Sequence, residues 1–352
     1  MSGVRGFAIA GRPVGPDHPP YVIAEMSANH GGDLERARRI IRLAAQTGAD
    51  SLKLQAYSAD SITIDCDGPD FRIEGESLWS GKRLYDLYQE AATPYEWFPE
   101  LFDYARKLNI TPFASVFDLD AVQMLEELDC PAYKIASFEA VDHALIAACA
   151  RTGKPLIIST GMCDADEAGE AIAVAQREGA GAVAILKCTS SYPARPEDAN
   201  LTTIPAMAAR YRIPIGVSDH TPGTAVAVAA CALGACIVEK HFIDAPEPLT
   251  ADSAFSLTPD EFARLVSEVK VAHASRGLEH YGPVEHEKRS LQFRRSLYVV
   301  RDVAKGQAFT RDNVRSIRPG MGLAPKHLDG VVGRKASHDI VAGTALSWNL
   351  IV

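Results

Sequence analysis

Short runs of apolar and β-branched residues recur along the first 241 positions of the chain, and segments with helical spacing separate them. Near-continuous apolar strands that alternate with helices are typical of a parallel sheet covered on both faces. Eight such runs within about 220 residues predict a closed (β/α)8 TIM barrel, with an open doubly wound sheet as the alternative. The predicted strands cover residues 22–27, 51–55, 111–116, 132–137, 155–160, 183–189, 213–219 and 236–241.

The segments between these runs have the features of helices. Residues 33–48 begin at Asp33, a residue type that caps helix N-termini, continue with apolar residues at helical spacing and end at Gly48. Residues 164–179 follow the same pattern, with acidic residues in the first turn. The amphipathic residues 260–275 are expected to cover the last strand.

One connection is much longer than a simple turn. About 40 residues separate the second predicted strand from a helix near residue 100, a length that usually has a function in a compact domain. It includes the segment LWSGKRLYDLYQEAATPYEW at residues 78–97. Two interpretations remain open: a lid or specificity loop on the active-site face of the barrel, or a helical insertion that packs on the barrel.

The composition and the pattern of apolar residues change after residue 283. Residues 284–352 have short strand-like runs, many Gly, Pro and Arg residues, and turn signals such as Lys305-Gly306. We therefore expect a barrel domain over residues 1–283 and a small β-rich domain over residues 284–352. A domain of about 65 residues is small for independent stability, so we expect it to dock on another surface.

The composition excludes several classes of partner. The chain has 352 residues, of which 47% are apolar and 23% charged, and its net charge is -9. This acidic balance argues against nucleic acid and against anionic membranes, because both require a basic surface. The seven cysteines form no CxxC motif and are expected to be free thiols of a cytoplasmic protein. No apolar run approaches the length of about 18 residues that a membrane span requires.

Polar or ionisable residues end or follow nearly every predicted strand. An unpaired charge inside a barrel wall is costly, whereas the carboxyl ends of barrel strands converge on one cavity. We therefore expect these residues to share one site. In chain order they are Glu25 with Asn29 and His30, Lys53 with Gln55, Ser115, Lys134 with Ser137, Ser159, Lys187, Ser218 with His220, and Glu239 with His241.

Two lysines of this set lie within apolar runs. Lysine is rarely buried without a partner, and Lys53 and Lys134 with their hydroxyl neighbours favour a site for a phosphate or carboxylate ligand. The alternative is a lysine that forms a Schiff base, as in class I aldolases. Borohydride trapping with substrate distinguishes the two, because only a Schiff base is trapped.

Two histidines end neighbouring predicted strands. This placement puts the imidazoles of His220 and His241 within reach of one ion, as in an open catalytic metal site. Glu239 and Asp252 could ligate the ion or orient its ligands. Mn, Mg, Co and Zn all remain possible. Arg318, on a glycine-rich turn of the distal domain, is by itself expected to be an ordinary surface arginine.

Eight motifs in nearly unbroken order resemble the sialic acid synthase family over essentially the whole chain. They are AEMSANHGGD, LKLQAY, YKIASFE, ISTGM, KCTSSYP, GVSDHT, VEKHF and RPGMGL. The last segment is similar to the family's antifreeze-like (SAF, β-clip) domain. AEMSANH and the segment 78–97 resemble the pseudaminic acid branch, which condenses phosphoenolpyruvate with 2,4-diacetamido-2,4,6-trideoxy-L-altrose and releases phosphate with C–O cleavage. The alternatives are the N-acetylneuraminate branch, which uses N-acetylmannosamine, and the legionaminic acid branch.

The resemblance implies roles for individual residues. Ser115 replaces the family's threonine and keeps a hydroxyl, whereas Ser190 replaces an asparagine. Arg318 matches an arginine that the SAF domain of one subunit inserts over the partner's barrel, which reverses the interpretation above and implies a domain-swapped homodimer. Phosphoenolpyruvate-binding positions correspond to Lys53, Ser115, Lys134, Ser137, Ser159 and Ser218; metal ligands to His220 and His241; and positions around the reacting carbons and the acceptor sugar to Glu25, Gln55, Ser190, Tyr192, Glu239 and Asp252. Glu25 is the first candidate for the proton-handling group and Glu239 the second.

Overall fold

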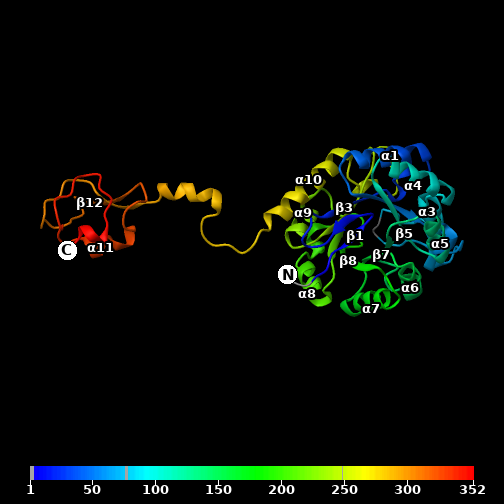
Figure 1. Cartoon of the computed structure of the whole chain (residues 1–352). Helices are drawn as coiled ribbons and strands as arrows, with labels where there is room; N and C mark the ends of the chain where they lie inside the picture. The colour runs from blue at the N-terminus through cyan, green and yellow to red at the C-terminus, as the bar shows by residue number, and fades with distance from the viewer. Residues whose placement is uncertain (1–3, 76–77, 248) are drawn as a thin grey trace. The chain divides into compact units, whose positions relative to one another are not determined.

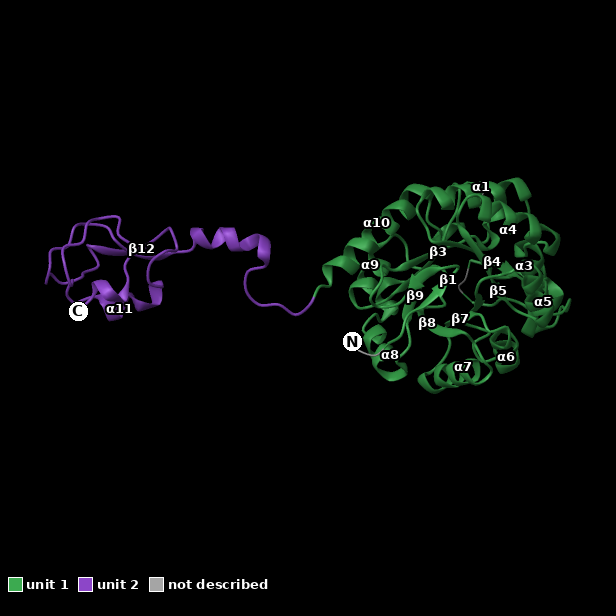
Figure 2. Cartoon of the chain, viewed as in Figure 1, with its two compact units in different colours: residues 1–277 green, residues 278–352 purple. Residues whose placement is uncertain are grey.

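The computed structural model shows a large helical and stranded unit followed by a small one (Figure 1). It describes residues 4–75, 78–247 and 249–352. The chain divides into two compact units at residues 1–277 and 278–352 (Figure 2). The boundary at 283/284 stays a prediction, and residues 1–3 of the expected barrel domain and 76–77 of the long connection lie outside the described residues.

The first unit is built around a closed barrel of parallel strands. Each strand pairs with its neighbour in the chain, and the last pairs with the first, so that His241 lies opposite Glu25. The predicted (β/α)8 barrel is therefore confirmed, and the open sheet is not formed. The strands are β3 (Tyr21–Glu25), β4 (Ser51–Ala56), β5 (Thr111–Val116), β6 (Tyr133–Ile135), β7 (Pro155–Ser159), β8 (Ala182–Cys188), β9 (Ile215–Asp219) and β10 (Ile237–His241).

Helices surround the barrel and bury the outer faces of the strands. All five residues of β3 are buried, which explains why its sequence shows no alternation of polar and apolar positions. A hairpin of β1 (Phe7–Ile9) and β2 (Arg12–Val14) precedes the barrel. The helices are α1 (Leu34–Gln46), α2 (Ala59–Ile62), α3 (Leu84–Ala91), α4 (Phe98–Lys107), α5 (Leu119–Glu127), α6 (His143–Arg151), α7 (Ala165–Arg177), α8 (Thr203–Tyr211), α9 (Ala225–Ala232) and α10 (Pro259–Ser275).

The helix signals in the sequence act as predicted. The Asp33 side chain accepts hydrogen bonds from the backbone N–H groups of Glu35 and Arg36 and so caps α1. Gly48 follows α1 with a positive φ of 81°, a conformation that glycine adopts without steric cost. Asp164 forms a capping box with Glu167 at the start of α7.

The long connection after β4 contains two short helices, α2 and α3, and backbone hydrogen bonds join described residues between them. The Ile73 N–H donates to the Lys82 carbonyl at 3.0 Å, and the Gly81 N–H donates to the Ile73 carbonyl at 2.9 Å. Trp79 Nε1 donates to the Ala251 carbonyl at 3.1 Å. The connection is therefore a folded insertion that is tied to the loop after β10.

The second unit has its own small core. Antiparallel strands β11 (Ser296–Val299) and β12 (Val314–Ile317) pack with α11 (Leu328–Val331). Leu297, Phe309 and Leu346 are fully buried among other apolar side chains of this unit. The predicted β-rich character of the C-terminal segment is confirmed. No helix of the described residues is long and apolar enough to cross a membrane.

Candidate active site

Four buried charges from different strands meet inside the carboxyl end of the barrel. Lys53 on β4 forms an ion pair with Glu25 on β3, and its Nζ lies 3.9 Å from Glu239 Oε2 on β10. Lys134 Nζ on β6 lies 3.0 Å from Glu239 Oε1. The four side chains are nearly inaccessible to solvent, so their charges interact in a medium of low dielectric constant. Together they form one continuous network of two cations and two carboxylates.

Hydroxyl groups complete this network. Lys53 Nζ donates to Ser115 Oγ at 2.7 Å, and Ser218 Oγ donates to Glu239 Oε1 at 3.0 Å. Ser137 Oγ accepts a hydrogen bond from the Gly161 N–H at 3.2 Å. Ser159 Oγ is buried and has no hydrogen-bond partner within the described part of the chain. A cluster of lysines and hydroxyls with unused hydrogen-bonding capacity suits an anionic ligand.

The pKa values of the two carboxylates are shifted in opposite directions. Burial raises the pKa of Glu25 to about 7 against the attraction of Lys53. Burial also acts to raise the pKa of Glu239, but Lys134 and Lys53 outweigh it and hold that pKa at about 2. Neighbouring carboxylates with separated pKa values are typical of an acid–base pair, and Glu25 is the one that exchanges a proton near neutral pH.

The two histidines lie side by side at the ends of β9 and β10. The ring centroids of His220 and His241 are 5.3 Å apart. His220 Nδ1 lies 3.0 Å from the Thr189 carbonyl, to which it must donate, so its Nε2 is the nitrogen left for a ligand. His241 Nδ1 is buried, makes no hydrogen bond to any described residue, and lies 3.7 Å from Asp252 Oδ2.

This donor set fits a divalent ion only in part. No group of three or more His, Cys, Asp or Glu side chains among the described residues is arranged to hold a metal. The chain therefore offers two imidazole nitrogens, and further ligands would have to come from substrate or water. Tyr192 and Phe255 pack against the imidazoles, with ring centroids 4.5 Å from His220 and 4.8 Å from His241 respectively, and so restrict their orientation.

A cavity of about 570 Å³ opens beside the imidazole pair. Its polar lining includes the predicted residues Gln55, Ser190, Tyr192, His241 and Asp252. The rest of its wall comes largely from the insertion after β4. The cavity is large enough for a sugar-sized ligand next to the buried network.

Three members of the expected ring of strand-end residues lie elsewhere. Lys187 Nζ donates to the Cys188 carbonyl and to Thr189 Oγ1, whereas Cys188, the next residue on β8, has its Sγ 4.0 Å from His220 Nδ1. The amide of Asn29 bonds Phe242, Thr250 and Ser256. The ring nitrogens of His30 bond Thr93 and Gly32, and burial lowers its pKa to about 4. These interactions make Asn29 and His30 structural residues that hold the mouth loops.

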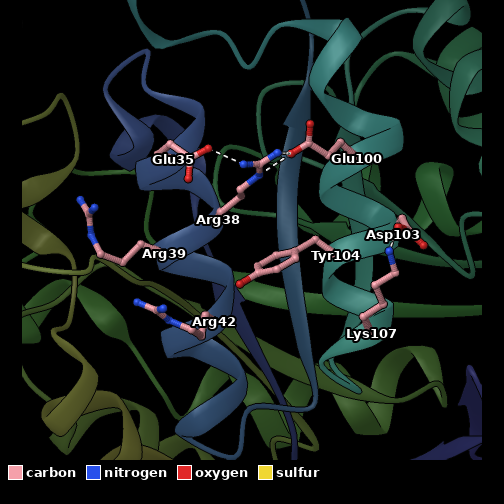
Figure 3. A pocket seen from close by; sticks show the side chains of 8 residues that line it. All are labelled: Glu35, Arg38, Arg39, Arg42, Glu100, Asp103, Tyr104 and Lys107. Atoms are coloured by element: carbon pink, nitrogen blue, oxygen red, sulfur yellow. Dashed lines mark hydrogen bonds and ion pairs between the residues drawn. The ribbon is translucent and has the colours of Figure 1, made fainter.

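A second hollow lies on the outside of the barrel between α1 and α4 (Figure 3). Arg38 forms ion pairs with Glu35 and Glu100 across it, and Lys107 Nζ lies 2.6 Å from Asp103 Oδ2. Such exposed pairs are typical of a solvated helix surface and contribute little stability. We assign no site to this hollow.

Two family models match the chain and together cover most of it. Residues 40–281 match the NeuB family, and residues 294–352 match the SAF domain. The chain belongs to the NeuB family. The predicted membership and the predicted SAF domain are thereby confirmed.

Relatives of this NeuB-family chain agree with the assignment. The pseudaminic acid synthase of Helicobacter pylori is 42% identical over 331 residues, which cover 94% of this chain and 97% of the relative. The pseudaminic acid synthase of Campylobacter jejuni is 41% identical over 330 residues, covering 94% and 96%. The crystal structure of N-acetylneuraminic acid synthetase from Leptospira borgpetersenii, in complex with citrate, is 30% identical, covers 83% of this chain and 96% of that one, and superimposes with a TM-score of 0.74.

Several residues at the mouth of this NeuB-family barrel were not singled out from the sequence. Cys188 is buried beside His220, and although burial acts to raise its pKa, His220 lowers it to about 7. Phe255 contacts both imidazoles, and Trp79 packs on Tyr192 at 5.6 Å. Glu139, the last residue of the YKIASFE motif, lines the cavity, but it lies beyond the predicted strand end and was not among the expected site residues. Arg318 belongs to the second unit, and a role for this residue at the cavity stays a prediction.

Proposed function

We propose that the chain is a pseudaminic acid synthase, which condenses phosphoenolpyruvate with 2,4-diacetamido-2,4,6-trideoxy-L-altrose. The observation that carries this proposal is the network of two lysines, two carboxylates and hydroxyls beside an imidazole pair at one barrel mouth. The chain is 42% and 41% identical to the two pseudaminic acid synthases but 30% identical to the N-acetylneuraminic acid synthetase, and this difference supports the altrose acceptor.

Phosphoenolpyruvate is expected to bind at the lysines. Its phosphate and carboxylate would accept hydrogen bonds from Lys53 and Lys134 and from the nearby hydroxyls of Ser115, Ser137, Ser159 and Ser218. Glu25 and Glu239 form ion pairs with the two ammonium groups. The bound anion would take over part of that neutralisation and strengthen the tendency of Glu25 to hold a proton.

His220 and His241 are the residues that would hold a divalent ion, for which Mn, Mg and Co are the candidates. Such an ion supplies Lewis-acid polarisation of a carbonyl oxygen. The orphaned Nδ1 of His241 and the fixed tautomer of His220 support this assignment. Asp252 Oδ2 lies 3.7 Å from this Nδ1 of His241, so it would lie beside a bound ion.

Carbon–carbon bond formation and phosphate release then follow in sequence. The vinyl carbon of phosphoenolpyruvate attacks the aldehyde carbon of the open-chain sugar, whose oxygen takes up the proton that Glu25 holds. Water adds to the phosphate-bearing carbon, and the resulting tetrahedral intermediate expels phosphate with cleavage of the C–O bond. The Glu25 carboxylate that this transfer leaves then accepts the proton of the attacking water, a step that its raised pKa of about 7 favours, and Glu239 stabilises the neighbouring lysines.

A domain-swapped homodimer is expected to complete the site. Large apolar side chains stand exposed on loops that follow barrel strands: Phe138 is 59% exposed, Met162 59% and Leu249 74%. In the SAF domain, Met321 is 73% exposed three residues after Arg318. Exposed apolar residues of this kind are typical of surfaces that associate, and they support insertion of Arg318 over the barrel of a second copy.

The rival functions make different predictions. A Schiff-base aldolase needs a neutral lysine, whereas Glu239 and Glu25 together outweigh burial and raise the pKa of Lys53. Burial does lower the pKa of Lys134, so borohydride trapping on that residue remains the decisive test of this rival. A non-enzymatic binding protein would release no phosphate at all.

An acceptor panel tests the proposed function. The protein is mixed with phosphoenolpyruvate, a divalent ion and either the diacetamido altrose, N-acetylmannosamine or its 6-phosphate, and phosphate release is measured. We expect turnover with the altrose and much weaker turnover with the others. Phosphoenolpyruvate labelled with ¹⁸O at the bridging oxygen should place the label in phosphate; label in the sugar acid would refute C–O cleavage.

A further inference from the structure

The cavity beside the imidazole pair has two chemically different sides. The strand ends and the loops directly after them contribute its charged and amide side chains, Gln55, Glu139 and Asp252, together with the aromatic Phe117 and Phe138. The insertion after β4 contributes aliphatic side chains to the same cavity, namely Ile62, Ile73, Leu84 and Leu87. We call these four side chains the aliphatic wall. None of them has a polar atom, so the wall cannot hydrogen-bond a ligand.

Packing holds the aliphatic wall in place. Leu87 is 6% exposed, and next to it Tyr88 packs edge-on against Tyr57, with ring centroids 6.1 Å apart. Tyr57 in turn packs against Phe117 at 5.1 Å. These three aromatic rings line the same cavity, so their mutual packing fixes the surface next to Leu87 and reduces the ordering that a ligand requires there.

The insertion is also tied to the catalytic side. The hydrogen bond from Trp79 Nε1 reaches the carbonyl of Ala251, the residue before Asp252. The ring of Trp79 packs on Tyr192, which packs on His220. These contacts fix Trp79, which lines the same cavity as the aliphatic wall, relative to the imidazole pair.

We propose that the aliphatic wall selects the acceptor by receiving its C6 methyl group, an inference that rests on the proposed function. The aldehyde carbon has to lie beside the imidazole pair, so the other end of the six-carbon chain points away from the strand ends. The wall is the side of the cavity that the strand ends do not build. A methyl group there loses contact with water at no polar cost, whereas these four side chains offer a hydroxyl no hydrogen-bond partner.

The expected preference for a 6-deoxy over a 6-hydroxy acceptor can be estimated from other apolar pockets. An apolar pocket typically disfavours a ligand that merely adds a hydroxyl by about 100-fold. The wild-type chain should therefore prefer the 6-deoxy acceptor over its 6-hydroxy counterpart, 2,4-diacetamido-2,4-dideoxy-L-altrose, by about this factor in kcat/KM. Phosphoenolpyruvate contacts other residues, so its KM should not depend on the wall.

Three isoleucines of the insertion give a matched test. Ile62 and Ile73 line the cavity, whereas Ile64 is 59% exposed and does not. Replacement by Thr keeps the β-branched shape and puts a hydroxyl in place of the ethyl group. The double variant Ile62→Thr/Ile73→Thr should lower the preference for the 6-deoxy acceptor at least about 10-fold, with the KM for phosphoenolpyruvate unchanged. Ile64→Thr should keep the wild-type preference.

The outcomes distinguish this inference from the proposed function. If the wild type turns over N-acetylmannosamine better than the diacetamido altrose, the proposed acceptor is wrong and the role of the wall falls with it. If the wild type prefers the 6-deoxy altrose but the double variant keeps that preference, the proposed function stands and the wall is not the selector. Equal loss of preference in Ile64→Thr would also overturn the inference.

Discussion

Replacement of Lys134 by Met separates the two tasks that the buried network performs. Met matches the length of the lysine side chain and carries no charge. In the structure it would leave Glu239 Oε1 with only the hydrogen bond from Ser218, while Lys53 stays 3.9 Å from the other carboxylate oxygen. We expect both a loss of stability and a loss of affinity for phosphoenolpyruvate.

The size of each loss follows from the burial of the groups. Lys134 and Glu239 are 2% and 5% exposed, so solvent does not screen them. Removing one partner of a buried ion pair costs about 3–5 kcal/mol, and the remaining attraction of Lys53 favours the lower end, which corresponds to a fall of about 6–12 °C in Tm. A hydrogen bond between charged groups contributes about 1.5–3 kcal/mol, so the Kd for phosphoenolpyruvate should rise about 10- to 150-fold.

Lys240 is the matched control. It is also a fully buried strand lysine, paired with Asp219 at 2.8 Å, but it is not part of the lysine–carboxylate network inside the barrel mouth. Lys240→Met should lower Tm by a similar amount and leave binding of phosphoenolpyruvate intact. Thermal unfolding and isothermal titration calorimetry of both variants check this. Unchanged affinity in Lys134→Met, or equal loss of affinity in both variants, would refute the assigned anion site.

Three further predictions concern the proton, the ion and the dimer. Burial raises the pKa of Glu139 from 4.5 to about 7, so the folded chain keeps a proton that the unfolded chain releases, and stability should fall as pH rises through this window. Glu139→Gln should therefore unfold with about 1–3 kcal/mol more free energy than the wild type at pH 8 and show no gain at pH 4; equal effects at both pH values in urea titrations would contradict this origin. A chelator should abolish phosphate release, Mn, Mg or Co should restore it, and the ion should raise the Tm of the wild type but not of His241→Ala; an unaltered Tm response in that variant would reject the ligand. Arg318→Ala and His241→Ala subunits, each inactive alone, should regain about one quarter of wild-type activity after subunit exchange, because half of the dimers would then hold one intact site; no recovery would exclude a site shared between subunits.

The linear pattern of residues was sufficient for the fold and for the kinds of chemical groups at the site. Parallel barrel strands are buried on both faces, so each appears in the sequence as an apolar run that local composition reveals. An unpaired lysine or carboxylate inside such a run is energetically costly. Lys53, Lys134 and Glu239 could therefore be recognised as candidate site residues before their partners were known.

The tertiary structure decided which of these residues act together. Whether Lys187 or Cys188 contacts the imidazole pair depends on the register and tilt of β8 within the closed barrel, and neighbouring residues of a strand face opposite ways. His30 forms its hydrogen bond with Thr93, 63 positions away, so its structural role could not be seen from local sequence. The aliphatic wall likewise exists only because the insertion folds back to the mouth, where Trp79 meets Ala251. Contacts between residues distant in sequence depend on the packing of the whole barrel, and local patterns of polarity carry no information about them.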